Sequence, residues 1–136
     1  MHEHHAGLPE LPPTRPVEDS WDRRRRQYET WLASEEAELL IADKQGKLIG
    51  YAMLRFMPGP ATWDVGESVA EIETLSVAPE ARSTGVGARL VAAARASAQQ
   101  AGAATLLVAA VHTNEAALRF YQREGFEPFY VLLASR

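Results

Sequence analysis

The chain has 136 residues, of which 46% are hydrophobic and 24% are charged. These values are ordinary for a globular protein, and this length suits a single domain that buries about two thirds of its unfolded surface. The formal charge of -4 argues against a nucleic-acid binder, because such proteins rely on an excess of basic residues. The absence of cysteine excludes disulfides, thiolate catalysis and cysteine metal sites.

The ends of the chain carry no targeting signal that we recognise. No apolar run reaches the roughly 18 to 20 residues of a membrane span, and the N-terminus makes a poor signal peptide. We therefore expect a cytoplasmic protein without a membrane or nucleic-acid partner. Residues 1–19 contain four prolines and are expected to be irregular. His2, His4 and His5 lie at the chain end without partner ligands, so no metal site is expected.

The first predicted helix covers about residues 20–33. Asp19 or Ser20 serves as its cap, and an apolar stripe follows at helical spacing, made of Trp21, Tyr28, Trp31 and Leu32. Four consecutive arginines at 23–26 wrap around the helix. Their simplest interpretation is a solvated surface, and an anionic contact is the alternative.

Three strands are predicted next. Residues 37–42 and 48–57 are extended runs joined by a turn at 43–47, which together indicate an antiparallel hairpin. A loop from Pro58 to about residue 70 leads to a third strand over Glu71 to Val77, which Pro79 ends.

The second half alternates helices and strands. A helix over 86–101 presents Leu90, Val91, Ala94 and Ala98 on one side. The aliphatic run 105–111 predicts a strand buried on both faces. Thr113 or Asn114 then caps a helix that Gly125 ends, and 126–133 is the last predicted strand. The order α-β-β-β-α-β-α-β predicts an α/β fold with a mixed sheet, a single domain over 1–136 whose core is 20–136.

One run between the third strand and the second helix has the composition of an anion site: Arg82, Ser83, Thr84, Gly85, Val86, Gly87, Ala88 and Arg89. The first amides of a helix lack internal acceptors, and the helix dipole adds positive charge there. Gly85 and Gly87 carry no Cβ that would block the approach of a phosphate. The functional interpretation of this run is a phosphate-binding turn. The structural alternative is that the two glycines only form a turn before the helix.

Spacing excludes two phosphate-binding motifs. A Walker loop needs Lys and Ser or Thr after its last glycine, whereas Gly87 is followed by Ala88 and Arg89. A dinucleotide fingerprint needs a third glycine where this chain has Leu90, and it must directly follow its strand.

The remaining pattern, R-x-x-G-x-G-A after V-x-P-E, resembles the acyl-CoA pyrophosphate loop of the GNAT family of N-acetyltransferases. A second run, Asn114 to Phe126, is similar to the family's N-x-x-A-x-x-x-Y-x-x-x-G-F segment. The resemblance covers about residues 20–133 and implies transfer of an acyl group, usually acetyl, from CoA to an amine. Family members normally begin with a strand and a helix, for which residues 1–11 leave little room, so we expect an incomplete acceptor side.

The resemblance also implies roles for individual residues. The amides of Arg82 to Ala88 hold the pyrophosphate of acetyl-CoA, Leu75 and Val77 offer backbone groups to the pantetheine arm, and Asn114 reaches the same arm or only caps its helix. Tyr121 donates a proton to the departing thiolate, which suits a phenol protonated at neutral pH. The structural alternative for Tyr121 is a core position, and Phe120 is expected to pack.

Glu71 and Glu73 are the candidate bases, because alternate residues of a strand share one face. Glu71 also lies fourteen residues before Gly85, the spacing of the family's strand glutamate. His112 is the second candidate, and some family members work without a dedicated base.

The acceptor side gives weaker signals. Asp64, Glu67, Glu71 and Glu73 favour a cationic amine, either a small molecule or a peptide, and Trp63 is a candidate lid. An acyltransferase, a CoA-binding regulatory module and a purely structural protein all stay open at this point. An open sheet edge would invite a second copy of the chain.

Overall fold

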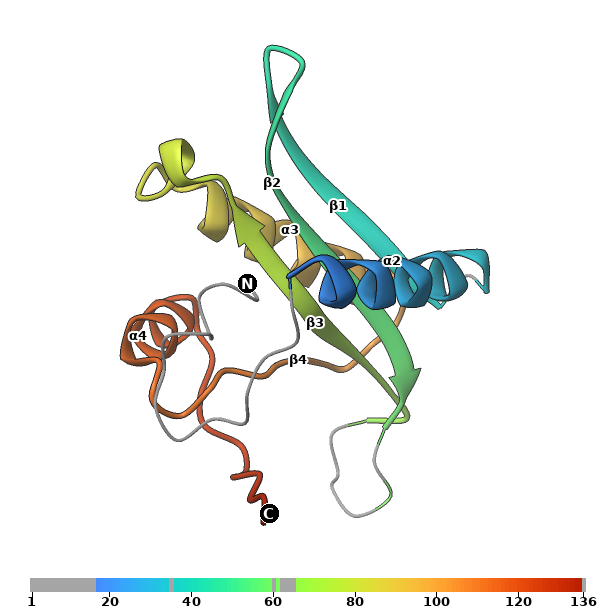
Figure 1. Ribbon diagram of the computed structural model, residues 1–136. Helices are drawn as coiled ribbons and strands as arrows, with labels where there is room; N and C mark the ends of the chain where they lie inside the picture. The colour runs from blue at the N-terminus through green and yellow to red at the C-terminus, as the bar shows by residue number, and fades with distance from the viewer. Residues whose placement is uncertain (1–16, 35, 60, 62–65, 136) are drawn as a thin grey trace.

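The computed structural model describes residues 17–34, 36–59, 61 and 66–135, with side chains from Asp22 onward in the first helix. The elements in chain order are α2 (Val17–Ala33), β1 (Ala37–Lys44), β2 (Lys47–Pro58), β3 (Ser68–Val77), the 3-10 helix η1 (Pro79–Ala81), α3 (Val86–Gln100), β4 (Thr105–Val108) and α4 (Glu115–Arg123) (Figure 1). The predicted α/β class with a mixed sheet is confirmed within this part of the chain.

The sheet has the strand order β1-β2-β3-β4. β1 pairs with β2 and β2 with β3 in antiparallel fashion, whereas β3 and β4 run parallel. Gln45 and Gly46 form the turn of the first hairpin with φ values of 53° and 81°. Two consecutive positive φ angles are typical of the type I′ turn that matches the twist of the strands, so the predicted hairpin is confirmed.

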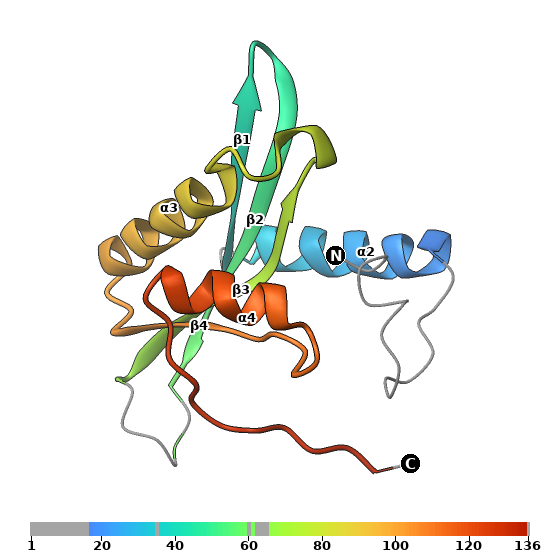
Figure 2. The same cartoon turned by 90° about the vertical axis from the view of Figure 1, so that its left-hand side faces the viewer.

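The helices cover both faces of the sheet, with α2 on one and α3 on the other (Figure 2). The main core lies on the α3 side, because Leu90, Val91, Ala94 and Ala98 recur on one surface of α3 and pack against β2 and β3. α4 joins this core through Tyr121. The predicted helix face is thus confirmed.

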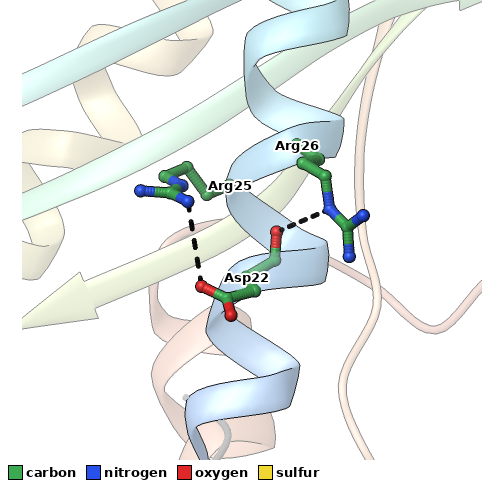
Figure 3. Close-up of polar contacts among 3 residues, drawn as sticks. All are labelled: Asp22, Arg25 and Arg26. Carbon is green, nitrogen blue, oxygen red and sulfur yellow. Dashed lines mark hydrogen bonds and ion pairs between the residues drawn. The ribbon is translucent and has the colours of Figure 1, made fainter.

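α2 differs from the prediction in two respects and agrees with it in a third. It begins at Val17, so Asp19 and Ser20 lie inside the helix and do not cap it. Of the predicted stripe, Tyr28 is buried, whereas Leu32 is 39% exposed. Arg25 and Arg26 bond to Asp22 on their own helix (Figure 3), which agrees with a solvated surface. Residues 1–16, with the three early histidines, lie outside the described residues.

The end of the chain also departs from the prediction. β4 stops at Val108, three residues before the predicted end, and residues 126–135 form no strand. The run Phe129–Leu133 is exposed and leaves the body of the protein (Figure 2). Its β-branched and aromatic residues have strand propensity, but a strand also needs a neighbour with free backbone groups, which propensity cannot supply. Over the described ranges, no helix combines the length and apolarity needed to cross a bilayer.

Candidate active site

The predicted phosphate-binding turn connects β3 to α3. η1 begins at Pro79, and the Thr84 hydroxyl donates a hydrogen bond to the carbonyl of Ala81. Ser83 and Gly85 both have left-handed backbone, with φ values of 64° and 88°. Gly85 is the N-cap residue of α3, and no side chain in the described part of the chain caps this helix. The first amides of α3 are therefore available to an external anion.

The two glycines of the turn have different surroundings. A Cβ on Gly85 would have no atom within 4 Å, so only its positive φ favours glycine there. A Cβ on Gly87 would lie 3.2 Å from Cζ of Phe120 and 3.9 Å from Cγ2 of Val77. The distance to Phe120 is tight and the distance to Val77 is an ordinary contact, so Gly87 favours the close approach of α4, which adds a packing role to the predicted one. It also confirms that Phe120 packs.

The strand ladder opens just before this turn. β3 and β4 pair only from Val69–Thr105 to Ile72–Val108, although β3 continues to Val77. The amide of Ala78 bonds to the carbonyl of Ile49 on β2, so by strand alternation the backbone groups of Val77 and Leu75 face away from β2. Arg82 reaches this edge, where its Nε donates to the Val77 carbonyl at 3.4 Å.

α4 carries two of the predicted residues. Asn114 is 8% exposed, and its Oδ1 accepts a hydrogen bond from the Ala117 amide at 3.1 Å, so the predicted cap is confirmed and Thr113 is not the cap. Tyr121 is also 8% exposed and makes edge contacts with the rings of Phe120 and Phe126. Burial raises the pKa of Tyr121, which keeps the phenol protonated at neutral pH.

Glu71 and Glu73 lie on the other face of the sheet. The carboxyl group of Glu73 is a neighbour of the Glu71 carboxyl, as expected for residues on one strand face. The pKa of Glu71 rises from 4.5 to about 7, because burial and the neighbouring Glu73 carboxylate disfavour its charged form. Glu71 can thus gain or lose a proton near neutral pH, as a general base must.

Arg55 and Trp31 complete this cluster and were not among the sequence-based candidates. Nη1 of Arg55 lies 3.8 Å from Oε1 of Glu73, and the guanidinium lies 4.6 Å from the centre of the Trp31 ring. The sequence does contain a signal for Arg55, because it is a charged residue within an otherwise apolar strand. Strand alternation in residues 51–57 could therefore have indicated Arg55 as a candidate site residue.

The remaining candidates are less central. His112 is exposed and follows the end of β4 by four residues, so it does not end a strand as predicted. Trp63 and Asp64 lie outside the described residues, and Glu67 is exposed. Within the described ranges no three His, Asp or Glu side chains are arranged to hold a metal ion.

A cleft of about 740 Å³ borders the turn on its hairpin side. Its lining includes Lys44, Lys47, Glu80, Thr84, Val86 and Arg89. An ion pair of 3.0 Å between Lys47 and Glu80 links the hairpin to η1 across this region.

Known proteins share this arrangement. The sequence profile of the Acetyltransferase (GNAT) family matches residues 5–126. The chain belongs to this family. A mycothiol acetyltransferase of Cellulomonas flavigena is 29% identical over 154 aligned residues, which cover 91% of this chain and 44% of that protein. YhfO of Bacillus subtilis, an uncharacterised N-acetyltransferase, is 34% identical over 97 residues, which cover 71% of this chain and 62% of that protein.

A solved GNAT-fold neighbour supports the architecture. The structure of AAC(6')-Iy in complex with the bisubstrate analogue CoA-S-monomethyl-acetylneamine has a TM-score of 0.77 and 24% identity, covering 98% of this chain and 89% of that one. At this identity the likeness shows the fold. The chain spans less than half the length of the mycothiol acetyltransferase and less than two thirds of YhfO.

Proposed function

We propose that this GNAT-family chain is an N-acetyltransferase that moves the acetyl group of acetyl-CoA to a primary amine by direct attack. One observation carries the proposal. The backbone of β3 loses its β4 partner after Ile72 and runs directly into a turn whose helix, α3, has no side-chain cap. The backbone edge of β3 that β4 leaves unpaired can bind the pantetheine arm of CoA, and the anion site that follows it can bind the pyrophosphate.

On the donor side, we assign the pyrophosphate to the amides of Arg82 to Ala88, a run that comprises Arg82, Ser83, Thr84, Gly85, Val86, Gly87 and Ala88. Leu75 and Val77 bind the pantetheine arm through their backbone, which faces away from β2. An acyl-CoA thus displaces the contact between Arg82 Nε and the Val77 carbonyl, which frees the guanidinium to pair with phosphate. Asn114 stays on the helix cap beside this arm.

The chemistry needs a neutral amine, a polarised carbonyl and a proton for the thiolate. Glu71, directly or through water, takes the proton of the acceptor ammonium. The amine nitrogen then bonds to the acetyl carbon, and the bond from carbon to sulfur breaks. Tyr121 gives its proton to the sulfur, and the new amide nitrogen releases its extra proton to solvent, from which the Tyr121 phenolate is reprotonated. A backbone amide of the Leu75 to Val77 stretch polarises the carbonyl.

Tyr121 and Glu71 belong to opposite faces of the sheet. Tyr121 packs in the α3 core, whereas Glu71 contacts the Arg55 that packs on α2. Both side chains can act on the same thioester only if it lies beyond the end of the β3–β4 ladder, where the sheet no longer separates the two faces. The acceptor amine therefore approaches from the α2 face, and the relatives' names suggest a small molecule such as mycothiol or an aminoglycoside.

Two measurements test this proposal. CoA at a hundredfold excess over its dissociation constant should stabilise the fold by about 2.7 kcal/mol, whereas the unfolding free energy of a purely structural protein would not change. Thiol release from acetyl-CoA in the presence of an amine panel then separates an enzyme from a CoA-binding regulatory module. Tyr121→Phe should keep CoA binding and lose most turnover, about 100-fold or more for a lost general acid. Turnover at the wild-type rate would refute the role of Tyr121.

A further inference from the structure

Arg55 lies where three elements of the α2 face meet. In the β2–β3 ladder it stands directly opposite Glu71, and its Nη1 approaches Glu73 at 3.8 Å. Its guanidinium lies over the Trp31 ring of α2 at 4.6 Å. The ladder register shifts between Met53 and Leu54, so Glu73 is an extra residue on β3. This bulge brings Glu73 toward Arg55 although Glu71 is the residue opposite.

Arg55 has a donor that its contacts leave unsatisfied. Among the described residues its buried Nε has no hydrogen-bond partner, and the ion pair with Glu73 is longer than a hydrogen bond. A buried donor without a partner costs free energy, although the side chain as a whole is 35% exposed. The guanidinium beside the Glu71–Glu73 pair is therefore a candidate for a functional role.

The charged and titratable neighbours of Glu71 define what that role is. β3 provides Glu73 and β2 provides Arg55, which act on Glu71 in opposite directions. On the same face, Arg24 of α2 and Tyr51 of β2 act on Tyr28, which is bonded to Thr74, and not on Glu71. β4 contributes no ionisable side chain. Arg55 is thus the cation that opposes both burial and Glu73 at the Glu71 carboxyl.

We propose that Arg55 is a positioning residue for the acceptor chemistry, fixed by Trp31 and paired with Glu73, so that the Glu71–Glu73 pair can accept the proton of the amine. The inference rests on the proposed function. Arg55 touches no reacting atom in this scheme. The ammonium proton passes to an Oε atom of Glu71, and the guanidinium stays beside Glu73.

Carbon-detected NMR titration of the glutamate carboxyl carbons tests the electrostatic part without any substrate. The Glu71 signal is assigned with Glu71→Gln. Arg55→Met removes the charge and keeps an unbranched chain that packs on Trp31, and we expect the midpoint of Glu71 to rise by about one pH unit, within the range for a lost opposite charge. Arg55→Lys keeps the charge and should stay near wild type. Arg55→Gln is the second neutral variant if Arg55→Met does not fold, and Arg25→Met on the exposed side of α2 is the matched control.

Kinetics then test the functional part. A rise of one unit from about 7 lowers the charged fraction of Glu71 at pH 7 from about one half to about one tenth. The neutral Arg55 variants should therefore lose about fivefold in kcat/KM for the amine at pH 7, and the loss should shrink toward pH 9. The acid limb of their pH profile should move by the same number of pH units as the Glu71 midpoint measured by NMR.

An unchanged Glu71 midpoint overturns the proposal whatever the activity is. A moved midpoint with an unmoved acid limb also overturns it, as does an equal loss in Arg55→Lys and Arg55→Met at every pH, because a merely structural role predicts that pattern. Failure of the proposed function is recognised separately, since the wild-type protein would then release no thiol with any amine.

Discussion

The protonation of Glu71 should be visible in the stability of the protein. The pKa of this carboxyl rises from 4.5 to about 7 on folding, so the folded chain holds the proton more tightly than the unfolded chain between these values. The stability that Glu71 contributes is complete below pH 4.5 and is lost as the pH rises through about 7. Glu71→Gln cannot ionise, and it should therefore gain stability relative to wild type as the pH rises.

The magnitude follows from the same pKa values. At about 1.36 kcal/mol for each pH unit, the change from 4.5 to about 7 sets a ceiling of about 3.4 kcal/mol. The carboxyl is only partly buried, and solvent screening reduces the effect. We expect the difference in unfolding free energy between Glu71→Gln and wild type to increase by about 1 to 2 kcal/mol from pH 4.5 to pH 8.5.

Urea unfolding of both proteins at several pH values measures this difference, and other titrating groups largely cancel in it. Glu67→Gln is the matched control, because Glu67 is exposed just before β3. A flat or falling difference for Glu71→Gln would contradict the reasoning, since Glu71 would then ionise as easily in the folded chain as in the unfolded one.

Substitutions at three further positions test the turn and α4. Gly85→Ala should cost about 1 to 2 kcal/mol of unfolding free energy through its φ of 88° alone, whereas Gly85→Asn should cost less; equal losses would point to a contact instead. Gly87→Trp should abolish CoA binding measured by calorimetry, because its side chain displaces Phe120, and retained affinity would remove the assignment of the turn. Asn114→Ala should lower the unfolding free energy by about 1 kcal/mol through loss of the bond to Ala117, whereas Asn114→Asp should keep most of it; urea unfolding distinguishes them.

Local patterns predicted most of the elements. The 43–47 turn, the apolar spacing of α3 and the Asn114 cap depend on residues close in sequence, and each was confirmed. The failures involve distant partners. The run 126–133 has the composition of a strand. Its own residues do not reveal that β4 ends at Val108, or that β4 does not pair with this run. Likewise the start of α2 at Val17 was missed, since two plausible caps lie inside the helix.

The features of the candidate site also separate into those that local sequence predicts and those that depend on distant residues. The sequence by itself determined the family, the glycine-containing turn from Arg82 to Gly85 and the pair Glu71 and Glu73, because motif spacing and strand alternation are local properties. Only the tertiary structure decided that Gly87 packs on Phe120, that β3 outruns β4, and that Arg55 sits between Trp31 and Glu73. These depend on strand register and on which helix covers which face. Both are set by packing between residues far apart in the chain.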